Sequence, residues 1–319
     1  MMKKTVSIFL TMALALMGLV SCGKEEEKQI EKHVYESVVG EKYFSISYSP
    51  EKAEGGEYSA EEMTAIDKNA EAALVSQLSF LSSEHNGDIG NINAMANYVF
   101  DYDKDVASLM KKLYEISEAT GGAYKPVVVS TTEEYSCSAF IEITDEKLIK
   151  HDRNAKVDLM GISESYALSF AMENLKAAGL KEAILKYGNT VARIDERDEK
   201  SPVNVALYYA DGNADADAKL KLHSGYITTS TKDEQITDPV TGNALSARHN
   251  TVAVISDDAF VSSCLARAFM IMDTDDIFAL QSSGKYSFEV VIVESDMSVT
   301  STNGVSEKGL MEVETEAAE

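Results

Sequence analysis

The sequence predicts an α+β fold, built as a single two-lobed domain of mixed strands and helices. Segments with the two-residue alternation of strands and segments with helical spacing follow one another without regular β-α-β repetition. No stretch rich in proline or glycine divides the chain, so we expect one domain rather than two. With 319 residues, of which 45% are hydrophobic, the chain is long enough to bury a sizeable core.

The amino-terminal residues are predicted to be a targeting segment. Lys3 and Lys4 precede the apolar stretch 6–20, which is too short to span a bilayer comfortably. That stretch ends in Leu-Val-Ser-Cys, the pattern of a bacterial lipobox, in which the cysteine is lipidated. We therefore expect a lipoprotein signal peptide at 1–21, lipidation of Cys22 and a charged tether at 22–38. The alternative is an ordinary secretory signal with a chance cysteine.

Localisation and charge restrict the possible partners. A lipid anchor would hold the protein in the bacterial cell envelope, with its body in the periplasm or extracytoplasmic space and only the lipid in the membrane. The net charge of −24 argues against nucleic acid as a partner, because a phosphate backbone recruits Lys and Arg. An anionic ligand would need a metal ion or a local group of donors.

The domain is expected to span 39–303, and its first half mixes strands with amphipathic helices. Ser59 and Glu62 have the spacing of a capping box at a helix start. The predicted elements run in chain order as a strand at 43–48, a helix from 59 to about 78, a polar glycine-containing loop at 86–93, a helix at 103–119 that stops at Gly121-Gly122, and paired strands at 127–150.

The second half is predicted to begin with a helix that follows Gly161 and ends at Gly179. The later elements are a strand pair at 183–194 broken at Gly188-Asn189, strands at 203–209 and 218–222, a buried strand at 252–255, a helix at about 258–272 and a strand at 286–293. The acidic tail at 304–319 is expected to be frayed.

Cys137 and Cys264 are the remaining cysteines. Two cysteines make neither a disulfide framework nor a zinc signature, so we expect two buried free thiols, with a disulfide between them as the alternative. The five histidines show no ligand spacing. The sequence also has no phosphate-binding loop, no dinucleotide glycine fingerprint and no serine-hydrolase or zinc-protease motif.

Several short segments resemble, in order and spacing, the motifs of the FAD:protein FMN transferases, the ApbE-type flavin transferases. The matching segments are Gly-Gly-Ala-Tyr-Lys-Pro at 121–126, Asp-Leu-Met-Gly-Ile-Ser-Glu-Ser-Tyr-Ala at 158–167, Gly-Asn at 188–189, Thr-Ser at 229–230 and Asp-Pro-Val-Thr-Gly at 238–242, with a weaker echo at 87–93. The resemblance covers nearly the whole mature chain. It implies a fold of the flavin-transferase type and fits the lipobox, since members of this family are often lipoproteins.

The family uses Mg²⁺ to cut FAD at its pyrophosphate and joins FMN to a Thr or Ser of a target protein, and some members instead hydrolyse FAD. The resemblance thus implies FAD as substrate or ligand, Mg as cofactor and an envelope flavoprotein as target. It implies a flavin- and phosphate-binding site at Gly161, Ser163, Gly188, Asn189, Thr229, Ser230, Asp238, Thr241 and Gly242. Free amides at the helix start after Gly161 would attract the pyrophosphate.

Positions that handle charge depart from the family pattern. The family's metal ligands are Asp and Thr at i and i+4 of a helix, and the corresponding residues here are Ser262 and Ala266. With a carbonyl of Ser163 as the further ligand, Ser163 and Ser262 make a degenerate site, because Mg²⁺ prefers oxygen ligands that include a carboxylate. Asp258 precedes this turn and is expected to cap the helix. Glu164 stands where the family has Lys. Further changes are Lys125, Gln235 and Val240.

Two functions follow from these observations. The first is an active Mg-dependent enzyme that transfers FMN from FAD or hydrolyses FAD. The second is a member with weakened or lost activity, a non-catalytic flavin- or partner-binding lipoprotein on the same scaffold. The departures favour the second, because positions that hold the backbone are kept while positions that handle charge are changed. A plain solute-binding lipoprotein is a third class, against which the turn at 238–242 argues.

Overall fold

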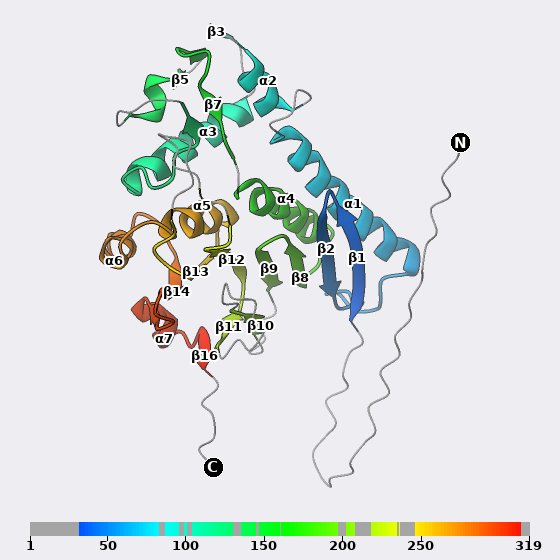
Figure 1. Cartoon of the computed structure of the whole chain (residues 1–319). Coiled ribbons are helices and arrows are strands. Elements are labelled where there is room, and N and C mark those ends of the chain that lie inside the picture. The colour runs from blue at the N-terminus through cyan, green and yellow to red at the C-terminus, as the bar shows by residue number, and fades with distance from the viewer. Residues whose placement is uncertain are drawn as a thin grey trace, which may run out of the picture. The chain divides into compact units, whose positions relative to one another are not determined.

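The computed structural model describes residues 32–82, 87–95, 99–100, 104–129, 135–144, 147–159, 161–196, 202–207, 218–234, 236 and 246–313 (Figure 1). From Lys32 onward the chain forms one compact unit. The predictions for the signal peptide 1–21, for lipidation at Cys22 and for Asp238, Thr241 and Gly242 lie outside the described residues.

The centre of the fold is an eight-stranded antiparallel sheet with the strand order β1-β2-β8-β9-β12-β13-β14-β15. Its strands are β1 (His33–Val39), β2 (Lys42–Tyr48), β8 (Glu182–Tyr187), β9 (Thr190–Asp195), β12 (Gly225–Thr231), β13 (Thr251–Ser256), β14 (Glu289–Val293) and β15 (Val299–Ser301). In β13, Val252 and Val254 enter one hydrophobic cluster while Ala253 and Ile255 enter another. Both faces of the sheet are therefore covered.

Three helices cover one face: α1 (Ala60–Phe80), α4 (Ser163–Ala177) and α5 (Ala259–Phe269). Helix α1 packs on α4, α4 packs on β8 and β9, and α5 packs on β12 and β13 (Figure 1). The opposite face carries a three-stranded sheet of β10 (Val203–Ala206), β11 (Ala218–Leu222) and β16 (Met311–Val313), together with α7 (Asn303–Glu307). In this arrangement the start of α4 lies beside Arg267, near the end of α5, and beside Gly188 in the β8–β9 turn.

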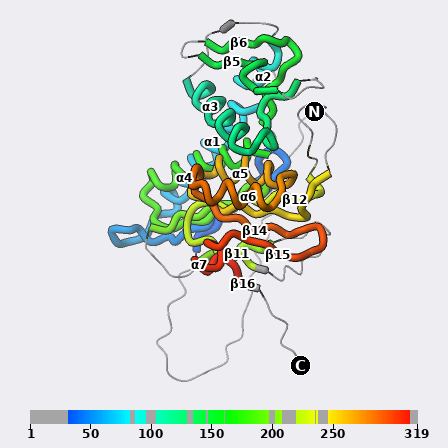
Figure 2. Tube along the Cα trace, turned by 90° about the vertical axis from the view of Figure 1, so that its left-hand side faces the viewer, coloured from blue at the N-terminus to red at the C-terminus, as the bar shows by residue number. Residues whose placement is uncertain are grey.

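A second group of elements lies on the side of α5 away from the sheet (Figure 2). It contains α2 (Asp88–Ala94), α3 (Lys104–Ala119), a short 3₁₀ helix (Cys137–Ala139) and the strands β3 (Val99–Phe100), β4 (Val127–Val128), β5 (Ile141–Ile143), β6 (Leu148–Lys150) and β7 (Lys156–Val157). Helix α6 (Thr274–Ser282) follows α5. One hydrophobic cluster joins this group to α5, β13 and β14, so the two lobes share a core.

The predicted α+β class and the two-lobed arrangement are confirmed. The capping box is also present, since Ser59 accepts a hydrogen bond from the Glu62 amide and Glu62 accepts one from the Ser59 amide. Asp258 caps α5 as expected. The predicted loop at 86–93 is wrong, because most of it is helix α2. In the region 127–150, β5 pairs with β6 as expected, whereas β4 pairs with the later strand β7.

The ordered domain extends beyond the expected limits of 39 and 303. Strand β1 begins at His33, inside the expected tether, and pairs along its whole length with β2. At the other end, α7 and β16 lie inside the expected frayed tail, and buried Val305 and Leu310 hold them against the sheet. Pairing with β2 thus extends the domain before residue 39, and buried apolar side chains extend it past residue 303.

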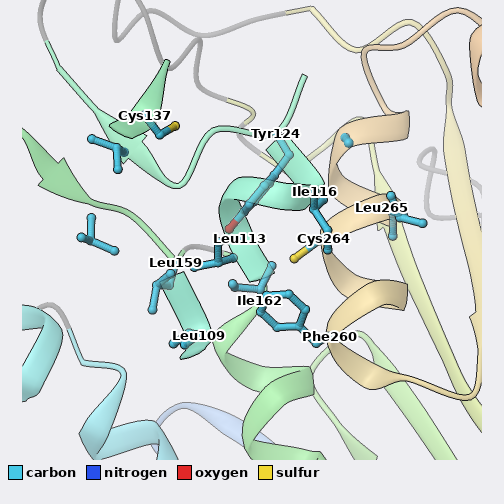
Figure 3. Packing of buried hydrophobic residues seen from close by; sticks show 14 of the residues in the cluster. Leu109, Leu113, Ile116, Tyr124, Cys137, Leu159, Ile162, Phe260, Cys264 and Leu265 are labelled. Atoms are coloured by element: carbon cyan, nitrogen blue, oxygen red, sulfur yellow. The ribbon is translucent and has the colours of Figure 1, made fainter. Parts of the chain in front are cut away.

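Both cysteines are free and buried, which confirms the prediction of two unpaired thiols. Cys264 of α5 lies among Phe260, Tyr124 and Leu113, which come from three different parts of the chain (Figure 3). Burial raises the pKa of both thiols, so neither is a reactive thiolate. Within the described residues, no helix is long and apolar enough to cross a bilayer.

Candidate functional site

The candidate site is built around the turn that leads from β7 into α4. Gly161 has a φ of +85°, a backbone conformation that glycine adopts without strain. The amides of Ile162 and Ser163 both donate to the carbonyl of Leu159, at 3.1 and 3.3 Å. The expectation of free amides at this helix start is therefore wrong for these two groups. The turn bonds these two amides internally, so neither is free to hold an anion.

Two of the resembling segments hold this turn in place. Asn93 donates from its side-chain nitrogen to the carbonyl of Val157 at 2.9 Å and accepts from the Val157 amide at 2.7 Å. The amide of Asp158 donates to the carbonyl of Pro126 at 2.9 Å, beside the pairing of β4 with β7. The segments 87–93 and 121–126 therefore act on the site by positioning the turn before Gly161.

The β8–β9 turn brings a further resembling segment, 188–189, to the start of α4. A Cβ atom at Gly188 would lie 1.8 Å from Oε2 of Glu164, so only glycine permits this close approach. Glu164 is also ion-paired with Lys42, from the start of β2. The charge reversal at Glu164 is thus compensated by a lysine from a distant part of the chain.

Strand β12 contributes Thr229 and Ser230. The amide of Thr229 donates to the carbonyl of Asn189 at 3.1 Å, which fixes the strand against the β8–β9 turn. Just beyond the strand, the carboxylate of Glu234 is hydrogen-bonded to the side chains of Ser230 and Asn189. The two segments predicted to bind phosphate therefore meet at one acidic side chain.

Helix α5 places Arg267 over this group. Its Cδ would be 3.2 Å from a Cβ at Gly161, and Nε and Nη1 would be 3.7 Å from the same point. Nη1 also lies 3.7 Å from Oε2 of Glu234, and the Arg267 side chain is only 14% exposed. Burial raises the pKa of Glu234 above its usual value, and the charge of Glu164 raises it further. The Arg267 charge and the hydrogen bonds from Ser230 and Asn189 oppose that rise.

A row of buried hydroxyls lies beneath the site. Ser165 of α4 is 2.5 Å from Thr190 of β9, Thr190 is 3.1 Å from Thr228 of β12, and Thr228 is 2.9 Å from Ser262 of α5. Ser262 also donates to the carbonyl of Ala259 at 2.9 Å. All four side chains are fully or almost fully buried. Ser262 therefore faces β12, and its hydroxyl is already engaged there.

The face of α5 that meets Gly161 is one residue out of step with the expected pattern. The side chain in contact with Gly161 belongs to Arg267, so its i−4 neighbour on that face is Ser263, rather than the expected pair Ser262 and Ala266. Neither Ser263 nor Arg267 offers a carboxylate. Among the residues that the structure describes, no three His, Cys, Asp or Glu side chains are grouped so that they could hold a metal ion.

The donor set at the start of α4 does not fit Mg²⁺. A guanidinium has no lone pair to donate, and its charge repels a divalent cation by about 2 kcal/mol at 4 Å even in bulk water. The carboxylate of Glu234, whose Oε2 lies 3.7 Å from Nη1 of Arg267, already pairs with that charge. The residues here suit an anion better than a cation.

The structure thus brings together Gly161, Gly188, Asn189 and Ser230 through Arg267, Glu234 and Glu164. Thr229 joins them through its backbone, while Ser163 begins α4 with its amide bonded to Leu159. Three residues were missed at the sequence level: Lys42, Glu234 and Arg267. Only Arg267 had a signal in the sequence, its position four residues after a serine in the helix that carries metal ligands in the resembling family.

A cavity of about 370 Å³ adjoins the turn before Gly161. Its lining comes from α2, β4 and β7 and consists of Gly90, Asn93, Ala94, Val128, Lys156, Val157 and Asp158. Lys125, which departs from the family pattern, lies on another cavity and places its Nζ 4.3 Å from the ring centroid of Tyr135. The charge of Lys125 is therefore engaged in a cation–π contact with Tyr135.

The sequence and the fold are both similar to those of known proteins. The family model for the ApbE family matches residues 43–292. The ApbE protein of Thermotoga maritima is 19% identical, with 88% of this chain and 99% of that chain covered and a TM-score of 0.71. The apo flavinyl transferase ApbE of Pseudomonas stutzeri is 17% identical, with 87% and 96% covered and a TM-score of 0.69.

The flavin transferase ApbE of Vibrio cholerae is 18% identical, with 88% of this chain and 99% of that chain covered and a TM-score of 0.68. At these identities the solved structures establish a shared fold. No curated protein matches the chain. Since the family match spans most of the sequence, the chain belongs to the ApbE family.

Proposed function

We propose that this protein is a flavin-binding lipoprotein of the cell envelope whose power to transfer FMN from FAD is weakened or lost. The family supports a flavin-transferase-like protein that takes FAD as its ligand. One observation carries the proposal: the segments predicted to bind flavin and phosphate converge on an Arg267–Glu234 ion pair. That pair favours binding of an anion over assembly of a metal-dependent reaction centre.

The side chains at this point have distinct tasks in binding. Asn189 offers an amide donor to phosphate oxygens, while the hydroxyl of Ser230 already donates to Glu234. Thr229 acts through its backbone, because successive residues of β12 face opposite sides of the sheet. Gly161 leaves room for the side chain of Arg267, and Gly188 leaves room for that of Glu164. When bound, Mg²⁺ supplies charge neutralisation of the pyrophosphate in the family reaction, but the residues over Gly161 do not fit such an ion.

Several parts of the proposal concern residues outside the described structure. Cys22 would carry the lipid and anchor the domain to the membrane, with the body in the periplasm or extracytoplasmic space. Asp238, Thr241 and Gly242 would form a rigid turn that completes the flavin-binding site. An envelope flavoprotein would be the target if transfer persists.

The test is to incubate the full chain with FAD and Mg²⁺, with and without an acceptor protein of the reference enzyme, and to follow flavin fluorescence and AMP release, because AMP leaves only when FMN passes to water or to a Thr or Ser hydroxyl. The flavin transferase ApbE of Vibrio cholerae serves as the reference in the same assay. We expect quenching of FAD fluorescence with AMP release at least 100-fold slower than in the reference. Magnesium-stimulated release at the reference rate would instead make the chain an active enzyme. Absence of FAD binding would leave a partner-binding role on the same scaffold.

A further inference from the structure

The most unusual side chain at the site is the cation that α5 presents to the start of α4. In a family whose reaction uses a divalent ion, the side chain that meets Gly161 is that of Arg267. Only 14% of this side chain is exposed, so its position is set by the packing of α5 against the turn. The positive charge is therefore a built-in part of this site.

Two amides at the start of α4 are already used as donors within the turn. The amides of Ile162 and Ser163 are bonded to Leu159, which lowers the capacity of the helix end to hold an anion. Lys42 is already ion-paired with Glu164. Arg267 is consequently the strongest anion-binding group that contacts this turn.

We propose that the guanidinium of Arg267 takes the place of the metal ion and binds the diphosphate of a flavin dinucleotide without a divalent cation. This inference rests on the proposed function and names the group that grips its ligand. A guanidinium presents N–H donors in a planar fork that matches two phosphate oxygens, and it stays charged at all relevant pH values. A dinucleotide diphosphate carries a permanent charge that such a fork can bind directly.

Glu234 is a counter-ion of Arg267 while the diphosphate is absent. Nη1 and Oε2 are 3.7 Å apart, which is an electrostatic contact longer than a hydrogen bond. The Glu234 carboxylate is anchored by Ser230 and Asn189, so it competes with the diphosphate for the guanidinium. Neutralising Glu234 removes that competition and should strengthen binding, whereas neutralising Arg267 should weaken it.

The experiment measures FAD binding to the full chain in detergent by fluorescence quenching, once with EDTA and once with millimolar Mg²⁺. We expect the two affinities of the unaltered chain to agree within about twofold. Arg267→Gln should weaken binding about 10- to 100-fold in EDTA, the loss expected for a charged hydrogen-bonding partner. Glu234→Gln should tighten binding severalfold. The matched control is Arg248→Gln, which removes an exposed arginine paired with Asp273 and should leave the affinity unchanged.

The outcomes separate this inference from the proposed function. FAD binding that collapses in EDTA, or that is the same in Arg267→Gln and Arg248→Gln, overturns the inference and leaves the proposed function intact. If FAD does not bind, inorganic pyrophosphate is the second probe. Arg267-dependent pyrophosphate binding in EDTA then supports the anion site while the flavin function falls, and no binding of either probe overturns both. The opposite sign expected for Glu234→Gln guards against misreading a folding defect in Arg267→Gln.

Discussion

Replacing Ser262 with aspartate is expected to bury a carboxylate in the core rather than to restore a metal ligand. The Ser262 side chain is fully buried, and its hydroxyl lies 2.9 Å from Thr228 and from the carbonyl of Ala259. Neither partner carries a charge, so the new carboxyl would stay protonated. Holding it neutral at pH 7 costs about 4 kcal/mol, because its ordinary pKa is about 3.9 and each pKa unit is worth about 1.4 kcal/mol.

Urea unfolding of Ser262→Asp beside Ser262→Asn measures this cost, since asparagine has nearly the same shape and does not ionise. Both variants should lose about 1–3 kcal/mol from the added atoms. The folded Asp variant binds more protons than its unfolded chain, so its stability rises as the pH falls. The gap of about 4 kcal/mol between the variants at pH 7 should therefore shrink to about 1.5 kcal/mol at pH 5.

Equal stability of the two variants at both pH values would refute this reasoning. It would mean that the side chain at position 262 reaches solvent or a cation, as the family pattern predicts. The register with Ser262 and Ala266 on the metal-binding face would then return in place of the register with Ser263 and Arg267.

Three further changes test other parts of the fold by urea unfolding. Ser59→Ala should cost about 1 kcal/mol through loss of the cap on α1. The pKa of Glu62 is lowered to about 2, so the stabilisation that Glu62 gives to α1 is present above about pH 4.5 and is lost as the pH falls toward 2. A helix content that stays constant over this pH range would contradict the assignment of the capping box. Asn93→Ala should cost about 1–3 kcal/mol, and Asn93→Asp less, because aspartate keeps the acceptor for the amide of its partner. Gly188→Ala should cost more than Gly284→Ala, since both have positive φ but only the first would push a Cβ into a carboxylate; equal losses would argue against the close approach.

The sequence predicts well those strands and helices that bury apolar side chains in a regular pattern. Strand β2, helix α3 and the β8–β9 pair all show it, and each is confirmed. Strand β12 was missed, although it lies in the middle of the sheet, because its residues at 228–231 are Thr-Thr-Ser-Thr. Two of these residues, Thr228 and Ser230, are buried with hydroxyl or carboxylate partners from other elements, and no hydrophobic pattern can reveal such partners.

Helix α2 was predicted as a loop because it contains Gly90, Asn91 and Asn93. Its end is stabilised from a distance, since Nζ of Lys150 donates to the carbonyls of Ile92, Asn93 and Met95. A lysine more than fifty residues away leaves no local signal in the helix it caps. Tertiary contacts of this kind make a segment helical when its intrinsic helix propensity is too low to predict a helix.

The candidate site was predictable only where its structure depends on neighbouring residues in the sequence. The glycines at 161 and 188 mark turns, and turn chemistry is local, so the sequence places them correctly. The ion pairs Arg267–Glu234 and Glu164–Lys42 join residues that are far apart in the chain. Their partners are chosen by the packing of α5 and β2 on the start of α4, which only the folded structure reveals.

The row of buried hydroxyls has a fixed hydrogen-bond direction at its Ser262 end. A carbonyl can only accept, so the single hydrogen of Ser262 points to Ala259, and Thr228 must give its own to Ser262. Thr190 has a second acceptor, since its hydroxyl lies 3.3 Å from Oδ1 of Asn189 as well as 3.1 Å from Thr228. The fixed direction therefore covers two O–H dipoles, from Thr228 to Ser262 and from Ser262 to Ala259. One backbone oxygen in α5 thereby sets the orientation of a hydroxyl in the middle of the neighbouring sheet.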